Sequence, residues 1–96
     1  MNWIFEIEDK SRRRIHLSKE QWKHIVTEHS DLANKIEDIK DTLTNPLTIK
    51  PSKYDENVRW YFRYNKKISK YLMVSVKYLN GEGFIITAFH ISKLSK

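Results

Sequence analysis

The chain has 96 residues, which is enough for one domain with one hydrophobic core and too few for a second module. It contains no cysteine, which excludes disulfide bonds and thiolate zinc sites. Eighteen Lys and Arg residues against twelve Asp and Glu residues give a formal net charge of +6, which favours polyanions as partners, with nucleic acid considered first and an acidic protein second.

Residues 2–17 carry the pattern of a β-hairpin. Apolar side chains alternate across residues 2–8, turn-forming residues occupy 9–11, and a second strand-like stretch covers 12–17. Acidic residues interrupt the N-terminal segment, so it lacks the long apolar run of a signal peptide or a membrane span. We therefore expect a cytoplasmic protein with no membrane partner.

Two helices are predicted next. Ser18 fits the first position of a capping box, and apolar residues then recur at helical spacing over 19–29. Ser30 or Asp31 can cap a second helix, whose narrow apolar stripe is flanked by charged residues that face water. We expect this helix to end before Pro46, because the residue preceding a proline disfavours the helical conformation.

From residue 47 onward the hydrophobic pattern repeats every second residue, which is typical of strands. Four strands are predicted, over residues 47–50, 58–64, 71–79 and 84–91, with a hairpin signal at Asn80-Gly81. The order ββααββββ groups strands without intervening helices, so the sequence predicts an α+β fold. We expect a single domain over residues 1–96, with the two helices packed on one face of an antiparallel sheet.

Two histidines on the first predicted helix are candidates for acid–base chemistry. His24 and His29 are five residues apart, about 140° around the helix axis, which is too divergent for a chelating pair. We therefore expect no metal site. Imidazole exchanges a proton near neutral pH, as a general base or acid must when it cleaves a phosphodiester next to a ribose 2′-OH. The alternative is structural, with His29 packed at the helix end and His24 on the surface.

The predicted strand over 58–64 has two chemically different faces. Arg59, Tyr61 and Arg63 alternate onto one face, whereas the other face is apolar and looks like a core face. Guanidinium groups hold phosphates, and a phenol between them stacks on a base or donates a hydrogen bond. We therefore predict that Arg59, Tyr61 and Arg63 bind RNA. The alternative is a solvated strand face with cross-strand pairs.

Several motifs that carry other chemistries are missing from the sequence. It has no Gly-rich phosphate loop, no Ser-nucleophile elbow, no metal-binding carboxylate cluster and no zinc-finger spacing. Any catalysis is therefore expected to rely on acid–base and electrostatic effects, with no metal and no cofactor.

Several segments resemble the phage-barnase, EndoU, colicin and RelE-like nucleases. The likeness lies first in residues 14–25, 29–32 and 39–46, and continues in residues 61–63, 72–77 and 84–89. It covers the chain from about residue 12 to residue 91. The resemblance implies a RelE-like (BECR) fold, with two helices against a curved antiparallel sheet. It also implies a metal-independent ribonuclease, which in many members of the family is a toxin against RNA.

The same resemblance implies which residues form the site. Carried over residue by residue, it points to four catalytic residues: His24, His29, Lys77 and Thr87. The family often has Pro where this chain has Ser30, and Tyr where this chain has Phe89. The second difference leaves one fewer hydroxyl near the expected site.

Our first hypothesis is a metal-independent endoribonuclease that cuts RNA by histidine-assisted transesterification and leaves a 2′,3′-cyclic phosphate. His24, on the more polar side of its helix, ranks ahead of His29 as the proton-transfer group. Lys77 with Arg59 or Arg63 stabilises the phosphorane charge, and Thr87 orients a phosphoryl oxygen. A second hypothesis is a catalytically silent RNA-binding or translation-modulating domain on the same fold. A third is a basic module bound by an acidic antitoxin-like or immunity protein.

The last hairpin decides whether Lys77 and Thr87 share a face of the sheet. A two-residue Asn80-Gly81 loop leaves Lys77 and Thr87 on different faces. A three-residue loop sets either Lys77 or Ser75 opposite Thr87, and so brings the two residues to one face. We expect the three-residue connection.

Overall fold

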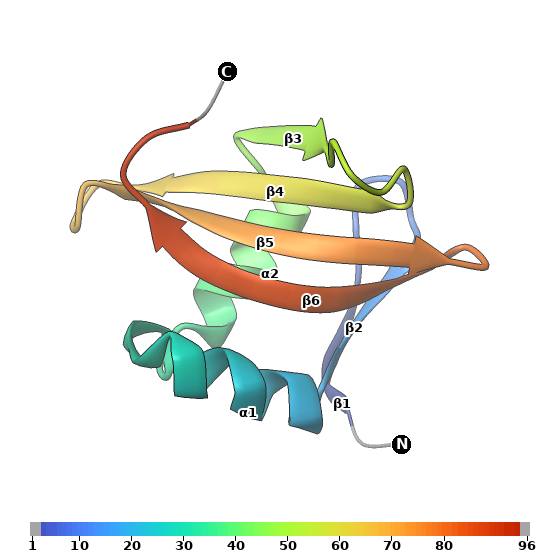
Figure 1. Cartoon of the computed structure of the whole chain (residues 1–96), viewed down its shortest axis with the longest axis horizontal. Helices are drawn as coiled ribbons and strands as arrows, with labels where there is room; N and C mark the ends of the chain where they lie inside the picture. The colour runs from blue at the N-terminus through green and yellow to red at the C-terminus, as the bar shows by residue number, and fades with distance from the viewer. Residues whose placement is uncertain (1–2, 95–96) are drawn as a thin grey trace.

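The computed structural model describes residues 3–94, so Asn2 and the extreme ends of the predicted domain lie outside the described residues. The predicted order ββααββββ is confirmed (Figure 1). The elements are β1 (Trp3–Glu8), β2 (Arg14–Ser18), α1 (Lys19–Glu28), the 3₁₀ turn η1 (Ser30–Leu32), α2 (Ile36–Thr44), β3 (Thr48–Pro51), β4 (Val58–Asn65), β5 (Lys70–Leu79) and β6 (Glu82–Ile91).

The helix starts differ in how well they were predicted. At α1 the predicted cap is present, because the Ser18 hydroxyl accepts a hydrogen bond from the Gln21 backbone N–H at 3.0 Å. The second helix begins later than expected, at Ile36. Residues Ser30–Leu32 form the η1 turn instead, and Leu32 is fully buried there. The apolar stripe read from the sequence is therefore divided between η1 and α2.

The six strands form one sheet in the order β1-β2-β6-β5-β4-β3. Neighbouring strands are antiparallel except β2 and β6, which run parallel and pair residues 15–16 with 83–84. The prediction of a wholly antiparallel sheet is therefore wrong at this junction, since alternation within a strand does not show which strands become neighbours. Glycine is required there, because a Cβ on Gly83 would lie 2.9 Å from side-chain atoms of both Tyr78 and Val76.

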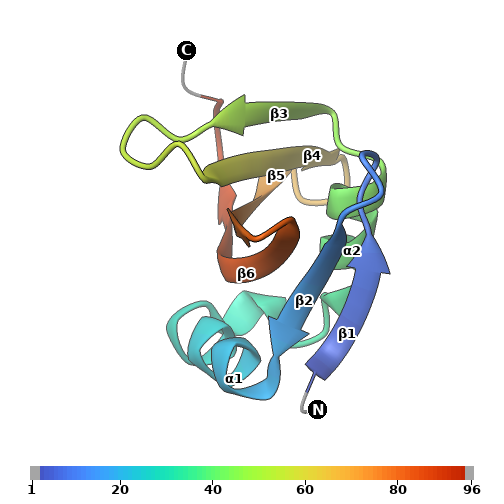
Figure 2. The same cartoon turned by 90° about the vertical axis from the view of Figure 1, so that its right-hand side faces the viewer.

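The two helices occupy different places. α2 packs against β4 and β5 on the inner side of the curved sheet, where Ile39 and Leu43 are fully buried (Figure 2). α1 lies along β6, beyond the short stretch that pairs with β2, and reaches the core through Ile25. The Gln21 side-chain amide donates a hydrogen bond to the Ile86 carbonyl. The expected packing of both helices on one face is thus not confirmed for α1, which lies along β6 and gives one of its backbone carbonyls a hydrogen-bond partner.

A buried polar cluster fastens the β1–β2 turn to the inner face of the sheet. One carboxylate oxygen of Asp9 accepts hydrogen bonds from the backbone N–H groups of Ser11 and Arg13, at 2.8 and 3.0 Å. The other accepts from the hydroxyls of Tyr78 and Tyr61, at 2.8 and 3.3 Å. Burial by itself raises the pKa of Asp9, but these hydrogen bonds, with one from the Ser11 hydroxyl, outweigh it and lower the pKa below its ordinary value.

The main core lies between α2 and the inner face of the sheet. Its fully buried side chains are Ile15, Leu17, Ile25, Leu32, Ile39, Leu43, Val74, Val76 and Ala88. Alternate residues of β4, β5 and β6 therefore point to the opposite side, which we call the open face. Among residues 3–94, no helix has the length and apolar character needed to cross a membrane.

Candidate active site

Three rows of side chains cross the open face where β4, β5 and β6 pair. In strand order, the rows are Val58–Lys77–Phe84, Trp60–Ser75–Thr87 and Phe62–Met73–Phe89. Paired residues on neighbouring strands lie about 5 Å apart, and successive rows are about 7 Å apart. The polar side chains of Lys77, Ser75 and Thr87 are therefore neighbours in the first two rows, and aromatic residues border them.

A β-bulge gives Thr87 its place on this face. The β5–β6 loop has two residues, Asn80 and Gly81, whose φ angles of 54° and 82° are those of a tight hairpin turn. The expected three-residue connection is therefore wrong. The register shifts once, between Val76↔Ile85 and Ser75↔Thr87, so that Ile86 is an extra residue in β6. This insertion moves Thr87 to the face of Ser75 and Lys77, which the loop alone would not have done.

Lys77 supplies a positive charge beside Ser75 and Thr87. Its Nζ lies 3.1 Å from a carboxylate oxygen of Asp55, in the β3–β4 connection, and its side chain is 39% exposed. A hydrogen bond from the Asn57 backbone N–H, followed by the one from Lys77, lowers the pKa of Asp55. The Asp55 carboxylate therefore holds the ammonium group in place while leaving part of it open to an anion from solvent.

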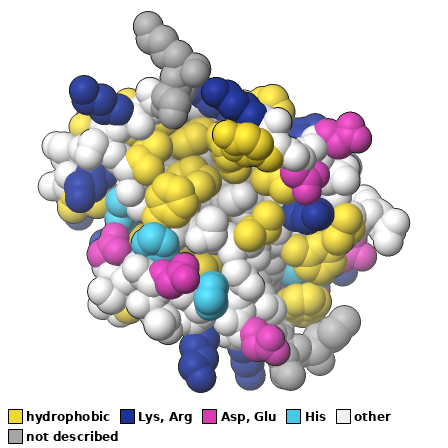
Figure 3. All heavy atoms as spheres, viewed as in Figure 1, with side chains coloured by type: hydrophobic (Ala, Val, Ile, Leu, Met, Phe, Trp, Pro, Cys, Tyr) yellow, Lys and Arg dark blue, Asp and Glu magenta, His cyan; other side chains and the backbone are white. Residues whose placement is uncertain are grey.

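The two candidate histidines lie at different places: His24 is within α1, and His29 follows its last residue. His29 caps the C-terminus of α1 and is half-buried, with its ring centroid 5.4 Å from that of Phe89 in the third row. His24 is 65% exposed, and its Nε2 lies 3.4 Å from a carboxylate oxygen of Glu28. It follows Gln21 by three residues, so it shares the helix side that contacts β6. Figure 3 shows histidine side chains beside the hydrophobic patch of the open face.

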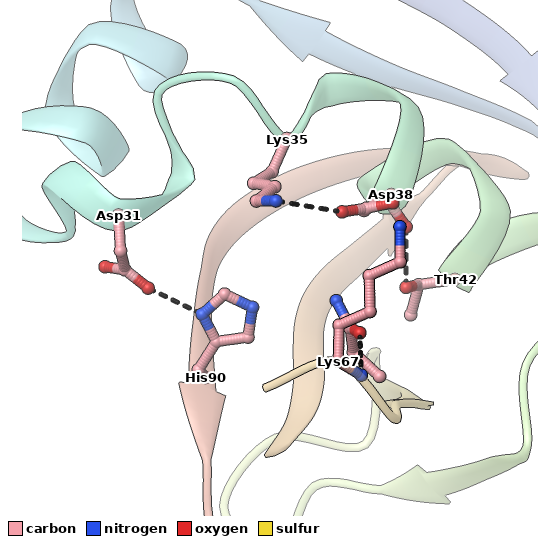
Figure 4. A network of polar contacts seen from close by, with 7 residues as sticks. Asp31, Lys35, Asp38, Thr42, Lys67 and His90 are labelled. Carbon is pink, nitrogen blue, oxygen red and sulfur yellow. Dashed lines mark hydrogen bonds and ion pairs between the residues drawn. The ribbon is translucent and has the colours of Figure 1, made fainter. Parts of the chain in front are cut away.

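A hydrogen bond between side chains holds the segment after α1 against β6. Figure 4 shows Asp31, in the η1 turn, directed at His90 on β6, with 2.5 Å between a carboxylate oxygen and Nδ1. The hydrogen bond with His90 is the main cause that lowers the pKa of Asp31. Because His29 immediately precedes η1, this pair helps to hold the His29 ring beside Phe89.

The faces of β4 are the reverse of those predicted. Tyr61 is only 4% exposed and belongs to the core, with its hydroxyl in the Asp9 cluster, so its expected role as an exposed stacking group is wrong. Arg59 pairs with Val76, and Arg63 with Leu72, both of which face the core side. The sequence showed that two faces exist, but only the position of α2 decides which of them is covered.

The two arginines also have partners of their own. One guanidinium nitrogen of Arg59 donates hydrogen bonds to the carbonyls of Glu56 and Val58, at 2.6 and 3.2 Å. A nitrogen of Arg63 donates to the Asn45 carbonyl at 2.7 Å. These bonds hold loops at the two ends of β4. Arg63 is therefore held at the opposite end of β4 from the row that contains Lys77, and the Arg59 nitrogen is held on backbone carbonyls, one of which belongs to Val58 in that row.

This geometry predicts how RNA binding depends on salt. We expect the double variant Arg59→Ala, Arg63→Ala to keep the wild-type slope of log affinity against log salt concentration. Lys77→Ala should reduce that slope by about 0.7, the value for one phosphate contact to a single strand. Titrations of a labelled single-stranded RNA at several salt concentrations measure both slopes. A drop of about 1.4 in the double variant would instead place both arginines on phosphates.

Three features of the site were missed by sequence reasoning. Asp55 and Ser75 were not singled out as neighbours of Lys77, and the apolar face of β4 was assigned to the core. The Asp55-Glu-Asn turn before β4 was the available signal for Asp55, but nothing local shows that it meets β5. In the described part of the chain, no group of three or more His, Asp or Glu side chains is arranged to hold a metal ion.

Comparison with known proteins gives one result. The family model described as phage-Barnase-EndoU-ColicinE5/D-RelE like nuclease2 matches residues 5–96, nearly the whole chain. A search of curated proteins found no match. The matched region includes all three rows of the open face, together with His24 and His29.

Proposed function

Since the chain belongs to the phage-Barnase-EndoU-ColicinE5/D-RelE like nuclease2 family, we propose that it is a metal-independent endoribonuclease. The observation that carries this proposal is the shared position of Lys77, Ser75 and Thr87 on the open face, with His29 beside the next row. The Lys77 cation and the half-buried Thr87 hydroxyl suit a phosphodiester, the buried Ser75 lies between them on the sheet, and a nearby imidazole suits the 2′-OH. RNA is the substrate that has both a phosphodiester and a neighbouring 2′-OH.

The proposed reaction is a transesterification. An imidazole takes the proton of the ribose 2′-OH, and the 2′-oxygen attacks the adjacent phosphorus. The bond from phosphorus to the 5′-oxygen breaks, and a second group returns a proton to that oxygen. The products are a 2′,3′-cyclic phosphate and a free 5′-OH. No redox step or added nucleophile is required.

Each residue has a defined role in this scheme. His24 is exposed and is the first choice for proton transfer, while His29 is its partner or positions it. Lys77 stabilises the charge that accumulates on the non-bridging oxygens, and Thr87 donates a hydrogen bond to one of them. Asp55, 3.1 Å from the Lys77 Nζ, holds the ammonium group in place.

Cleavage of mixed RNA by the pure protein in excess EDTA tests this proposal. We expect cleavage to continue and the products to end in 2′,3′-cyclic phosphate, because the 2′-oxygen is the nucleophile. An RNA with one 2′-deoxyribose at the cut site should resist at that site only. Lys77→Ala protein, purified in the same way, is the control for a contaminating nuclease: it should cut far more slowly than the wild type, whereas a contaminant would cut equally in both preparations. Loss of cleavage in EDTA would contradict metal independence.

One observation favours a second function on the same face. The carboxylate of Asp55 already neutralises much of the Lys77 charge, and Phe89 offers no hydroxyl beside Thr87. Both features suit an RNA-binding or translation-modulating domain that does not cut. RNA binding without any cyclic phosphate product would favour this reading.

The net charge of +6 also suits an acidic protein partner. For either RNA function, we propose that an acidic antitoxin-like or immunity protein binds the chain and blocks the open face. Co-purification of a small acidic protein, released at high salt, is the expected result.

A further inference from the structure

An apolar depression lies directly beside the polar part of the open face. Its lining residues are Trp60, Phe62, Met73, Phe89 and Ile91. Phe62 and Met73 are buried and form its floor, whereas Trp60, Phe89 and Ile91 are half-buried and form its walls. Figure 3 shows hydrophobic side chains gathered on this part of the face.

The depression is continuous with the proposed site. Trp60 belongs to the row of Ser75 and Thr87, while Phe62, Met73 and Phe89 form the next row, about 7 Å along the strands. If a phosphate is held at Thr87 and Lys77, the base of the same nucleotide can therefore reach the aromatic-lined depression. Phe89 also contacts His29, so it connects the depression to the histidine side of the site.

We propose that this depression is a nucleobase subsite, which holds the base next to the phosphate bound at Lys77 and Thr87. The proposal rests on the proposed function for the position of that phosphate. Planar rings bury well against Trp60 and Phe89, and each stacked base adds considerably to single-strand affinity. The neighbouring ammonium group and the net positive charge favour a nucleotide over a neutral apolar peptide.

The chemistry of the lining also predicts the specificity. The five lining residues offer one side-chain nitrogen, the indole N–H of Trp60, and the Lys50 ammonium lies 5.9 Å from the centroid of the Phe62 ring, so aromatic surface dominates the subsite and its polar groups are donors only. The preference of the subsite for one base over another should therefore depend mainly on the area of the base that stacks. We expect purines to bind more tightly than pyrimidines.

Binding of short single-stranded oligonucleotides tests the subsite without any requirement for cleavage. The probes carry 2′-deoxyribose throughout, which removes the nucleophile, and are either intact or abasic at one nucleotide. Wild-type protein should bind the best-placed intact probe about tenfold or more tightly than its abasic counterpart. Trp60→Leu and Phe89→Leu should lose most of this ratio while binding the abasic probe as the wild type does. Tyr64→Leu, altered on the same strand outside the depression, should keep the full ratio.

The outcomes separate the subsite from the proposed function. Cleavage of RNA together with equal affinity for intact and abasic probes at every position would overturn the subsite and leave the nuclease proposal standing. A clear preference for intact probes in a protein that never cuts RNA would support the subsite on an RNA-binding domain. A preference that Tyr64→Leu abolishes and Trp60→Leu retains would place the base elsewhere and overturn the proposal. The comparison of intact with abasic probes on the wild-type protein still tests the subsite if a variant fails to fold.

Discussion

Replacing His24 with alanine should lower the rate of RNA cleavage by about 100-fold or more at pH 7, because a positioned general acid or base contributes that much to proton transfer. His24 is the expected proton-transfer group, since its ring is exposed on the side of α1 that contacts β6. His29→Ala should also reduce the rate, but its ring packs on Phe89, so part of that loss would reflect altered geometry. Single-turnover cleavage of a defined RNA measures both rates.

The pH profile distinguishes chemistry from structure at these positions. Wild-type cleavage should peak between about pH 6 and 8, since one group must be deprotonated and another protonated. Removal of the true base should abolish the acidic limb of the profile, whereas a merely structural loss would lower the whole curve. Lys23→Ala, the exposed neighbour of His24 on α1, is the matched control and should retain the wild-type profile. Folded His24→Ala and His29→Ala proteins that both cut at the wild-type rate would rule out the histidine mechanism.

Asp9→Ala should destabilise the fold by about 3 kcal/mol, because the hydroxyls of Tyr61 and Tyr78 and two backbone N–H groups would lose a buried acceptor. Chemical denaturation at pH 7 measures this loss. Glu8→Ala, an exposed carboxylate one residue earlier, is the control and should stay within about 0.5 kcal/mol of the wild type. Equal losses in both variants would mean that the hydrogen-bond cluster does not stabilise the fold.

The same residue predicts how stability depends on pH. The pKa of Asp9 is lowered in the folded protein, so its contribution is fully present above its unfolded value of about 3.9 and is lost as the pH falls through the folded value. Wild-type unfolding free energy should therefore fall below about pH 4 more steeply than that of Asp9→Ala. Parallel curves for the two proteins in this range would contradict the role given to Asp9.

Much of the local structure follows from the sequence alone. The Ser18 cap, the place of the last hairpin at Asn80-Gly81 and the alternation along the strands each depend on neighbouring residues, so they are visible in the sequence and are present in the fold, whereas the two-residue length of that turn was not predicted. The element order and the family resemblance depend on the same local patterns, and the family is confirmed over residues 5–96. The sequence also identified Lys77 and Thr87 as candidates, but it did not determine whether they share a face.

Only the tertiary structure decided which surfaces meet. Alternation on β4 permits either face to be buried. The packing of α2 buries the face of Tyr61, so Trp60 lies half-buried on the open face, where it lines the depression. The extra residue at Ile86 places Thr87 beside Ser75, although a two-residue loop alone would have turned it inward. These outcomes depend on contacts between residues far apart in the chain, whose energies no local pattern encodes. The sequence by itself therefore determined the elements and the chemical groups, and long-range packing determined which groups form one site.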